Sequence, residues 1–526
     1  MIQPQTQNPD YWGSEFKITD SDIEQIYNHF LEAEKPQTVE QIALIIISHR
    51  LSEENARITR LLANRTIYQP KKSYEVGEQL VFPVMNFAHG EVTEIRDGFN
   101  PSYGKFNVIQ VDIKKKQREF AADLDIDHPL NAAHENLTVP VDEDQIEEIY
   151  DLYGYDIEDK IAAAMEAREE FMRLGRRWFV TALMAEVNVG HLHLSQAILE
   201  MYEGGPLPVS EILPHLDMDP GVDASVQAFS LNYALLKDER FDEVAPKGHV
   251  AWFLHDLEPE GVKQVPERLA YDPISFDRAL LGPQFVLLER ELDDEWSNIP
   301  QDSGVQPVVF TLMYPHRRVG ALPLSSRIRP LFPLSNSPRQ RAVLVDDKTG
   351  EEIVTWIVKE HRYIYGLKDW YEKNKIPIGG FVHLTPEPDS DIVKIGFDRR
   401  KAQREWVRLA TVSDNRIKFE LMRRAVSCGY DDLLIVGTDV VAAVDALWRR
   451  VDSHQRSVAS LLAELFPELA NLNPQNTVHA KTLYSAINML KRLPPGPIFA
   501  ELVRNPAFQP VGDHYWRFDS SRWQKE

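Results

Sequence analysis

Apolar residues recur at helical spacing near the start of the chain. In SDIEQIYNHFLEAE, the side chains of Ile23, Ile26 and Phe30 share one face behind a Ser/Asp cap. The segments TVEQIALIIISHRL and SEENARITRLLANR repeat this pattern after short turns, which gives three short helices in succession. Such a series is typical of a helix-turn-helix unit. We therefore predict a helix-turn-helix or winged-helix module over residues 18–70.

The third of these segments is rich in arginine. It carries Arg57, Arg60 and Arg65, at the place where a recognition helix contacts DNA. These three residues are candidate DNA-binding residues. The alternative is a small helical bundle whose solvent-facing side carries the arginines.

The hydrophobic period changes from helical to alternating near residue 73. Apolar and polar residues then alternate up to residue 113, and the runs turn at glycines, which predicts a small antiparallel β-barrel over residues 71–125. Within it, YEVGEQLVFP and HGEVTEI resemble the CarD-type RNA polymerase-interacting domain and related Tudor and SH3-like barrels. The resemblance implies that Phe82, Pro83 and Val84 lie near a protein-docking surface.

A strongly acidic stretch follows the predicted barrel. Residues 142–159, DEDQIEEIYDLYGYDIED, hold nine acidic residues and no basic one, and helical periodicity continues beyond them. We predict an acidic joint and a connecting helix over residues 126–189. The carboxylates either form a solvated helix face, or form a surface that keeps nucleic acid away and docks a basic partner.

Two later regions share a pattern of helices followed by two strands, a glycine turn and a tryptophan. The shared pattern spans Phe241–Trp252 in the first region and Phe508–Trp516 in the second. A wing hairpin explains it, because an aromatic residue of such a hairpin packs against the third helix and holds the hairpin in place. We predict winged helices over residues 190–260 and 454–526. The first copy is similar to the winged-helix family of the RNA polymerase delta subunit.

The last predicted winged helix is more basic than the middle one. Its Lys481 is therefore a candidate DNA-binding residue. A linker is predicted over residues 261–305, between the middle winged helix and the next group of strands.

Residues 306–400 are predicted to form strands around short helices. The run TWIVKEHRYIYGLKDWYEKNKIPIGGFVHL resembles the second half of a DNA-binding pseudobarrel in the spacing of Gly366, Trp370 and Gly379. That fold is shared by plant auxin-response-type transcription factors and the effector domains of some restriction enzymes. Residues 401–453 are predicted to be an α/β connecting region.

The pseudobarrel resemblance implies two DNA-gripping arms. The first arm follows the first strand and maps onto His316, Arg317 and Arg318. The second precedes the helix that carries Trp370. Its residues are Lys359, His361 and Arg362.

The distribution of charge points to the same region. The chain has a formal net charge of −23, yet residues 314–341 contain no acidic residue. Arginine binds phosphate and reads guanine edges with two hydrogen bonds. The alternative is that carboxylates elsewhere in the chain neutralise this segment. The arginines in it are Arg317, Arg318, Arg327, Arg329, Arg339 and Arg341.

The sequence contains no recognisable catalytic constellation. It has no Walker-type phosphate loop, no Gly-x-Ser-x-Gly elbow and no His-Glu-x-x-His pair. His191 and His193 have no third metal ligand nearby, and the single cysteine, Cys428, excludes an internal disulfide. We expect no enzyme activity, cofactor or metal. Neither a signal peptide nor a membrane-spanning apolar run is recognisable, so we expect a cytoplasmic protein.

These patterns predict an α+β multidomain protein with several winged-helix modules and small β-barrels, one of them a DNA-binding pseudobarrel. The function that they favour is that of a bacterial-type, transcription-associated regulator that binds double-stranded DNA. Its acidic modules would dock RNA polymerase or another protein. One alternative is an interaction scaffold with degenerate winged helices, and another is the DNA-recognition component of a defence or restriction system.

Overall fold

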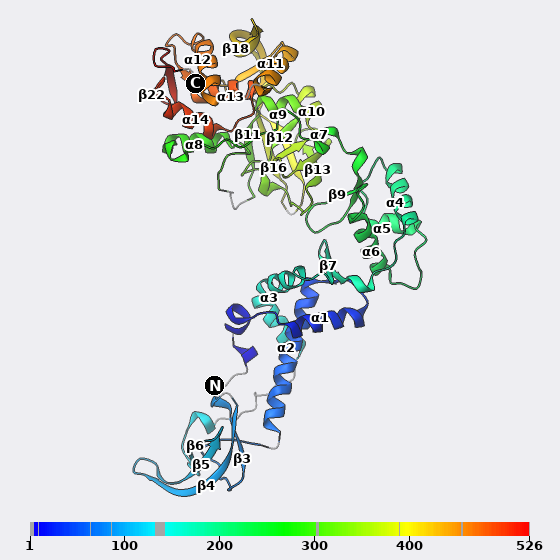
Figure 1. Ribbon diagram of the computed structural model, residues 1–526, viewed down its shortest axis with the longest axis vertical. Coiled ribbons are helices and arrows are strands. Elements are labelled where there is room, and N and C mark those ends of the chain that lie inside the picture. The colour runs from blue at the N-terminus through cyan, green and yellow to red at the C-terminus, as the bar shows by residue number, and fades with distance from the viewer. Residues whose placement is uncertain are drawn as a thin grey trace. The chain divides into compact units, whose positions relative to one another are not determined.

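The computed structural model describes residues 5–524 except 9, 64, 86, 132–141, 301–304, 389 and 454–455. The predicted α+β multidomain class is confirmed. The chain divides into two compact units (Figure 1). Unit 1 comprises Met1–Glu186 with Met218–Ser230, and unit 2 comprises Val187–Asp217 with Leu231–Glu526.

The helices of unit 1 enclose a small sheet. Phe30, Ile46, Ile161 and Trp178 belong to their common core and are almost fully buried. Along the chain, the elements of this core follow the order helix, strand, helix, helix, strand, strand. In the sheet, the strands lie in the order β1-β8-β7. The elements are α1 (Asp20–Ala33), β1 (Gln37–Thr38), α2 (Val39–Leu62), α3 (Glu143–Glu166), β7 (Phe171–Leu174) and β8 (Arg177–Val180), with the short helices η1 (Gln5–Gln7), η2 (Tyr11–Glu15) and η5 (Thr181–Leu183).

Two expectations for this unit are wrong. The separate helix predicted to start at Ser52 is the second half of α2, because no glycine or proline interrupts the chain between Thr38 and Leu62. The helix predicted to be a connector is α3, and its buried Ile157 and Met165 lie in the core. It therefore takes the place of the third helix.

A five-stranded sheet is inserted between α2 and α3. Its core stacks aromatic rings, with Phe82 4.9 Å from Tyr68 and 4.4 Å from Phe120 between centroids. Phe82 and Pro83 are buried, whereas Val84 is exposed. The strands run in the order β2 (Thr66–Ile67), β3 (Gln79–Phe82), β4 (Ala88–Asn100), β5 (Gly104–Ile113), β6 (Lys116–Ala122), with η3 (Pro83–Met85) and η4 (Pro129–Asn131) beside them.

The same order of elements occurs twice more along the chain. In the middle region, a bridge from Leu207 to Trp252 replaces the first strand. The elements there are α4 (Val189–Met201), α5 (Val209–Ile212), η6 (Leu213–His215), α6 (Ala224–Leu236), β9 (Phe241–Glu243) and β10 (Trp252–Leu254). The C-terminal elements are α12 (Val458–Ala470), β21 (Val478–His479), α13 (Ala480–Leu490), α14 (Pro495–Arg504), β22 (Phe508–Gly512) and β23 (Tyr515–Phe518), with the strand order β21-β23-β22.

A seven-stranded sheet with three short helices lies between these two regions in the sequence. The first helix ends at Gly320, whose φ is +81°. A side chain at this position would collide with Lys368, because an added Cβ would lie too close to it. Leu344, Ile357 and Val382 fill the core of the sheet. Its strand order is β11 (Val308–Thr311), β16 (Phe381–Pro386), β17 (Val393–Phe397), β13 (Arg339–Asp346), β14 (Glu352–Val358), β15 (Tyr363–Tyr365), β12 (Ala321–Pro323), and its helices are α9 (Tyr314–Val319), α10 (Lys368–Lys373) and η9 (Arg329–Leu331).

The region expected to be an α/β connection is a long β-ribbon. Strands β18 (Arg399–Ser413) and β19 (Arg416–Cys428) pair along most of their length, and β20 (Ile435–Thr438) adds to β18 before α11 (Val441–Ser453). Asp414 and Asn415 form the turn with φ of +50° and +60°. Two-residue hairpin turns of this hand favour Asp and Asn.

The expected linker over residues 261–305 contributes to the C-terminal core. Leu281, Phe285 and Leu288 are buried there, and the ring of Phe285 lies 4.9 Å from that of Phe499. The elements around this segment are η7 (His255–Leu257), α7 (Glu260–Lys263), η8 (Arg278–Leu280) and α8 (Pro283–Leu292). No helix in the described parts of the chain is both long and apolar enough to cross a membrane.

Candidate nucleic-acid interface

Carboxylates neutralise much of the arginine-rich segment. Arg318 lies 2.9 Å from Asp445, and Arg327 lies 3.0 Å from Asp293. Arg339 lies 2.8 Å from Glu258 and also contacts Asp242. These three arginines are therefore ion-paired within the protein.

The first predicted arm is anchored in the interior. His316 Nε2 lies 3.1 Å from Glu295 Oε1, and both side chains are almost fully buried. Arg317 donates to the carbonyl of Ile376 and stacks over the ring of Tyr371. Burial lowers the pKa of Arg317. These contacts hold the arm against its own protein.

Glu295 belongs to a buried charge network. The Arg492 guanidinium lies 2.8 Å from Asp294 and 2.7 Å from Glu295, and Tyr484 donates to Asp294. Burial raises the pKa of Asp294. At Glu295 the charges of Arg492 and His316 outweigh burial, so its pKa is lowered. The network joins the segment before β11 to the C-terminal helices.

Besides Arg317, two arginines of the segment, Arg329 and Arg341, have no carboxylate partner among the residues that the structure describes. Arg329 is exposed and Arg341 is half-buried. Burial lowers the pKa of Arg341. Of the two interpretations of this segment, the structure favours neutralisation by carboxylates elsewhere in the chain over a free basic face.

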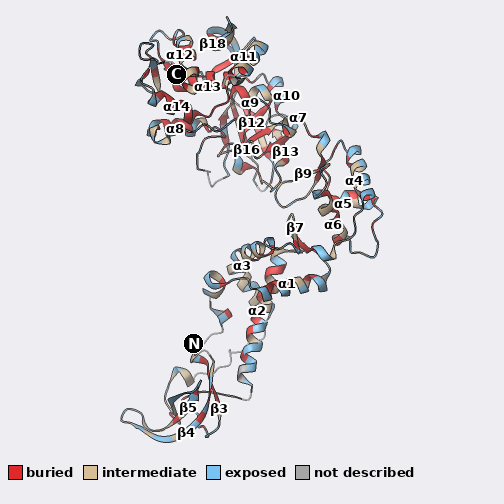
Figure 2. Cartoon of the chain, in the orientation of Figure 1, coloured by how far each residue is buried: buried red, intermediate tan, exposed pale blue. Residues whose placement is uncertain are grey.

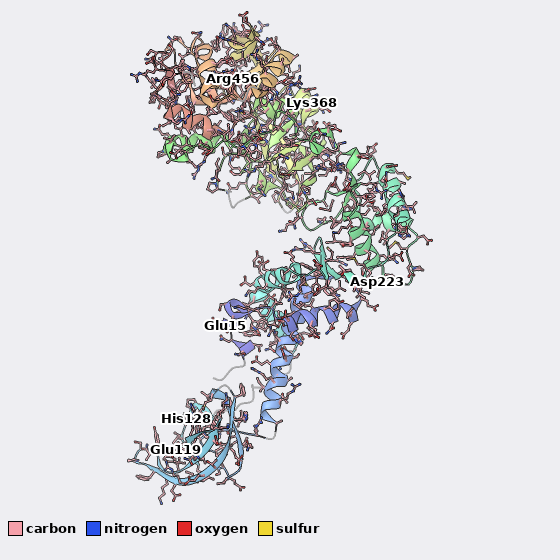
Figure 3. All side chains as sticks on the ribbon, in the orientation of Figure 1. Glu15, Glu119, His128, Asp223, Lys368 and Arg456 are labelled. Carbon is pink, nitrogen blue, oxygen red and sulfur yellow. The ribbon has the colours of Figure 1, made fainter. Side chains whose placement is uncertain are left out.

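The second predicted arm keeps part of its charge at the surface. The Lys359 ammonium donates to the carbonyl of Ser335. His361 is half-buried, and the exposed Arg362 stacks on Trp296 with its guanidinium carbon 4.8 Å from the ring centre. Figure 3 labels a further exposed cation of the same sequence region, Lys368 at the start of α10.

The remaining candidates lie apart from both arms. Arg57 pairs with Glu54 at 3.2 Å, Arg60 is exposed, and the half-buried Arg65 follows the end of α2 in unit 1. Lys481 in unit 2 is buried and pairs with Asp431 at 2.9 Å and with Glu291. Lys481 is therefore a structural cation.

The third helices of the three repeated regions do not present positive charge. Helix α3 carries nine acidic residues and one lysine, and α6 carries no charged residue. In DNA-binding winged helices this helix enters the major groove, where phosphates favour cations. These two helices therefore have no electrostatic attraction to DNA.

The third helix of the C-terminal region, α14, is covered. Its residues Pro495–Leu502 are all buried and are drawn in red in Figure 2. An added Cβ at Gly496 would meet the ring of Phe276, and Phe285 packs against Phe499. The segment that was predicted to be a linker, residues 261–305, therefore covers α14, which is the helix that would contact DNA in a DNA-binding winged helix.

The β18–β19 ribbon is rich in basic residues. Residues 399–428 hold nine basic residues against three acidic ones. Val407, Leu409 and Val426 on one face complete the core of the seven-stranded sheet. Ile417 and Phe419 near the turn pack into the C-terminal core. The ribbon is therefore fixed at two places.

The outer face of the ribbon combines arginine with an exposed tryptophan. Register places Arg404 opposite Ala425, Trp406 opposite Arg423, and Arg408 opposite Leu421. Opposed residues share one face of a ribbon, as do alternate residues of a strand. Trp406 is 64% exposed, and the Arg423 guanidinium lies 5.9 Å from its ring centre. We call these residues the ribbon face: Arg404, Trp406, Arg408, Leu421 and Arg423.

The charge of this surface is only partly neutralised. Arg400 and Arg424 pair with carboxylates, and Arg408 donates to the carbonyl of Asp432. Within the described part of the chain, Arg404 and Arg423 have no carboxylate partner. Anions from outside the protein can therefore approach both of them.

One cluster has the composition of a metal site. Asp242, His255 and Glu258 bring their ligand atoms within 4.8 Å of one another. The Arg339 guanidinium lies 2.8 Å from Glu258 and 3.2 Å from the His255 ring nitrogen. Because a cation already occupies this cluster, it is best explained as an ion-paired joint.

No family model matches the chain, and neither does any curated protein or solved structure. The ribbon was not among the elements predicted from sequence, although the sequence holds a signal for it. Two alternating runs with many arginines flank the turn residues Asp414 and Asn415, which is a hairpin pattern.

Proposed function

We propose that this chain is a regulatory protein that binds double-stranded DNA through the ribbon face and acts by binding, without catalysis. The observation that carries the proposal is the exposed pairing of Arg423 with Trp406 beside Arg404, two arginines without carboxylate partners among the described residues. A two-stranded ribbon fits the major groove of DNA. Cations on its outer face would contact phosphates or guanine edges.

The architecture supports this proposal in two ways. Seven strands with a short helix after the first strand and another after the fifth agree with the pseudobarrel resemblance. The repeated helix and strand order, with its outer strand pair, agrees with winged helices. Both folds are common in transcription-associated proteins, and both serve here as the support on which the ribbon is fixed.

The test is a salt titration of DNA binding. The full chain is titrated into a fluorescein-labelled 30-base-pair duplex, and anisotropy is measured at several salt concentrations. Release of counterions from phosphates should make log Kd rise with log salt, with a slope of about 0.9 per phosphate contacted. We expect a slope of at least about 2, one contact for each free arginine of the face. Absence of binding at low salt would contradict the proposal.

A second candidate function is that of a protein-interaction scaffold with degenerate winged helices. The observation that favours it is the covered helix α14. In that case the duplex would not bind, and the repeated order of helices and strands would serve protein contacts alone. The same titration therefore separates the two candidates.

A further inference from the structure

Helix α3 presents an outward face that no other described element covers. Positions 144, 148, 152, 155 and 159 follow one another at spacings of three and four residues, which places them on one side of a helix. Buried residues such as Ile157 and Ile161 occupy the opposite side. The outward positions are Asp144, Glu148, Leu152, Tyr155 and Asp159, and all of them are exposed.

The centre of this face is apolar. Leu152 is 68% exposed and Tyr155 is 78% exposed, although isolated exposed side chains of this size are ordinary in proteins. Here they are adjacent on one helix turn and carboxylates surround them. Aromatic residues at the centre of a polar rim are typical of protein interfaces.

The rim of the face is negative and lacks internal partners. Glu147, Asp151 and Asp156 flank the outward positions and are exposed. In the part of the chain that the structure describes, none of these carboxylates meets a cation. The one lysine of the helix, Lys160, donates to the carbonyl of Gly13 on the inner side. Like charges at a spacing of four residues destabilise a helix, so a cationic partner would relieve this cost.

We infer that the outward face of α3 docks a basic protein segment that offers lysine or arginine together with apolar side chains. Nucleic acid is excluded as its partner by the sign of the charge. The proposal does not depend on DNA binding, because α3 lies in unit 1 and the ribbon in unit 2. The third helix of the N-terminal repeat would thus bind a positively charged partner, whereas DNA is negatively charged.

The experiment uses two labelled helical peptides with equal numbers of lysines. In the first peptide the remaining positions are Leu and Ala, and in the second each Leu is replaced by Gln. Anisotropy measures their binding to the full chain at low and physiological salt. We expect the Leu-containing peptide to bind at least tenfold more tightly than the Gln-containing peptide, because Leu152 and Tyr155 need apolar contacts.

Two variants separate the contributions of the face. L152Q/Y155Q should remove the preference for the Leu-containing peptide, and E148Q/D151N/D159N should weaken binding of both peptides at least tenfold. L31Q is the matched control, because Leu31 is an exposed apolar residue of α1 in the same unit. It should bind both peptides as the wild type does. Circular dichroism and Tm would verify that each variant is folded.

Equal binding of the two peptides by the wild type, or an unchanged preference in L152Q/Y155Q, would overturn the inference. Failure of the wild type to bind either peptide would also overturn it. DNA binding by the same variants is expected to be unchanged, so the failure of this inference and the failure of the proposed function give different results.

Discussion

Two arginine-rich regions of unit 2 differ in what their charges do. In residues 314–341, Arg318, Arg327 and Arg339 meet carboxylates at 2.8 to 3.0 Å. On the ribbon face, Arg404 and Arg423 meet none among the described residues and lie beside the exposed Trp406. The number of arginines is similar, but most of those in residues 314–341 are ion-paired or half-buried, with Arg329 as the exposed exception among the described residues, whereas the ribbon face places two unpaired arginines side by side with an exposed aromatic ring.

The cause of the difference is where each region lies. The first region contains α9, β12, η9 and the start of β13, and its arginines meet acidic residues of segments that pack against these elements, such as Asp445 on α11 and Asp293 after α8. The ribbon buries one face against the seven-stranded sheet and the turn end of its other face against the C-terminal core, and it leaves Arg404, Trp406 and Arg423 in solvent. Arg318, Arg327 and Arg339 therefore act as structural cations, whereas Arg404 and Arg423 are available for binding.

The largest effect that follows from this comparison concerns Arg492. Replacement Arg492→Leu leaves Asp294 and Glu295 buried without their cation, and should lower the free energy of unfolding by about 3–5 kcal/mol. Urea denaturation measures it. Arg329→Leu, at an exposed arginine, should change stability by less than about 0.5 kcal/mol. Equal effects of the two replacements would remove the distinction between structural and free arginines.

A second prediction uses the pH dependence of the joint around Arg339. Burial and the charge of Asp242 raise the pKa of Glu258 from 4.5 to about 7. The folded protein therefore binds more protons than the unfolded chain between these values, and this contribution to stability is lost as pH rises through the window. Its size is on the order of 3 kcal/mol.

The measurement is the free energy of unfolding from pH 4.5 to 8 for the wild type and Glu258→Gln. The difference between them should show the wild type losing stability relative to the variant as pH rises toward 7. A difference that stays flat, or that runs in the opposite direction, would mean that Arg339 keeps Glu258 ionised throughout.

The smallest effect concerns Trp406. Its ring orients Arg423 through a cation–π contact at 5.9 Å, worth about 0.5–1 kcal/mol at an exposed site. Trp406→Ala should therefore weaken duplex binding by roughly two- to fivefold, with Trp406→Phe between it and the wild type. Because the side chain is exposed, unfolding by urea should be unchanged. An unaltered Kd would show that the ring takes no part in the site.

Sequence alone predicts much of this architecture. Helical periodicity gives α1, and the Phe–Gly–Trp echo marks the outer strand pairs of the middle and C-terminal repeats. Sequence did not predict that α3 completes the N-terminal repeat, because a five-stranded sheet separates it from α2. A sequence pattern shows which residues of a helix are apolar but does not show which distant segment they meet.

The site was harder to predict than the fold. A segment without carboxylates looks free of ion pairs, yet its partners Asp445, Asp293 and Glu258 lie far away in the sequence. The ribbon holds nine basic residues against three acidic ones, so its local net charge is as positive as that of residues 314–341, but a search for a segment without carboxylates passes over it. Neutralisation is set by tertiary contacts, and these are not visible in the composition of one segment.

The most direct test of the central claim compares charge reversal at the two regions. Duplex binding would be measured for R404E/R423E and for R329E, which reverses the exposed arginine of the other region. We predict that R404E/R423E weakens binding at least tenfold and lowers the salt slope by about 2, while R329E binds as the wild type does. Loss of binding in R329E with unchanged binding in R404E/R423E would contradict the account.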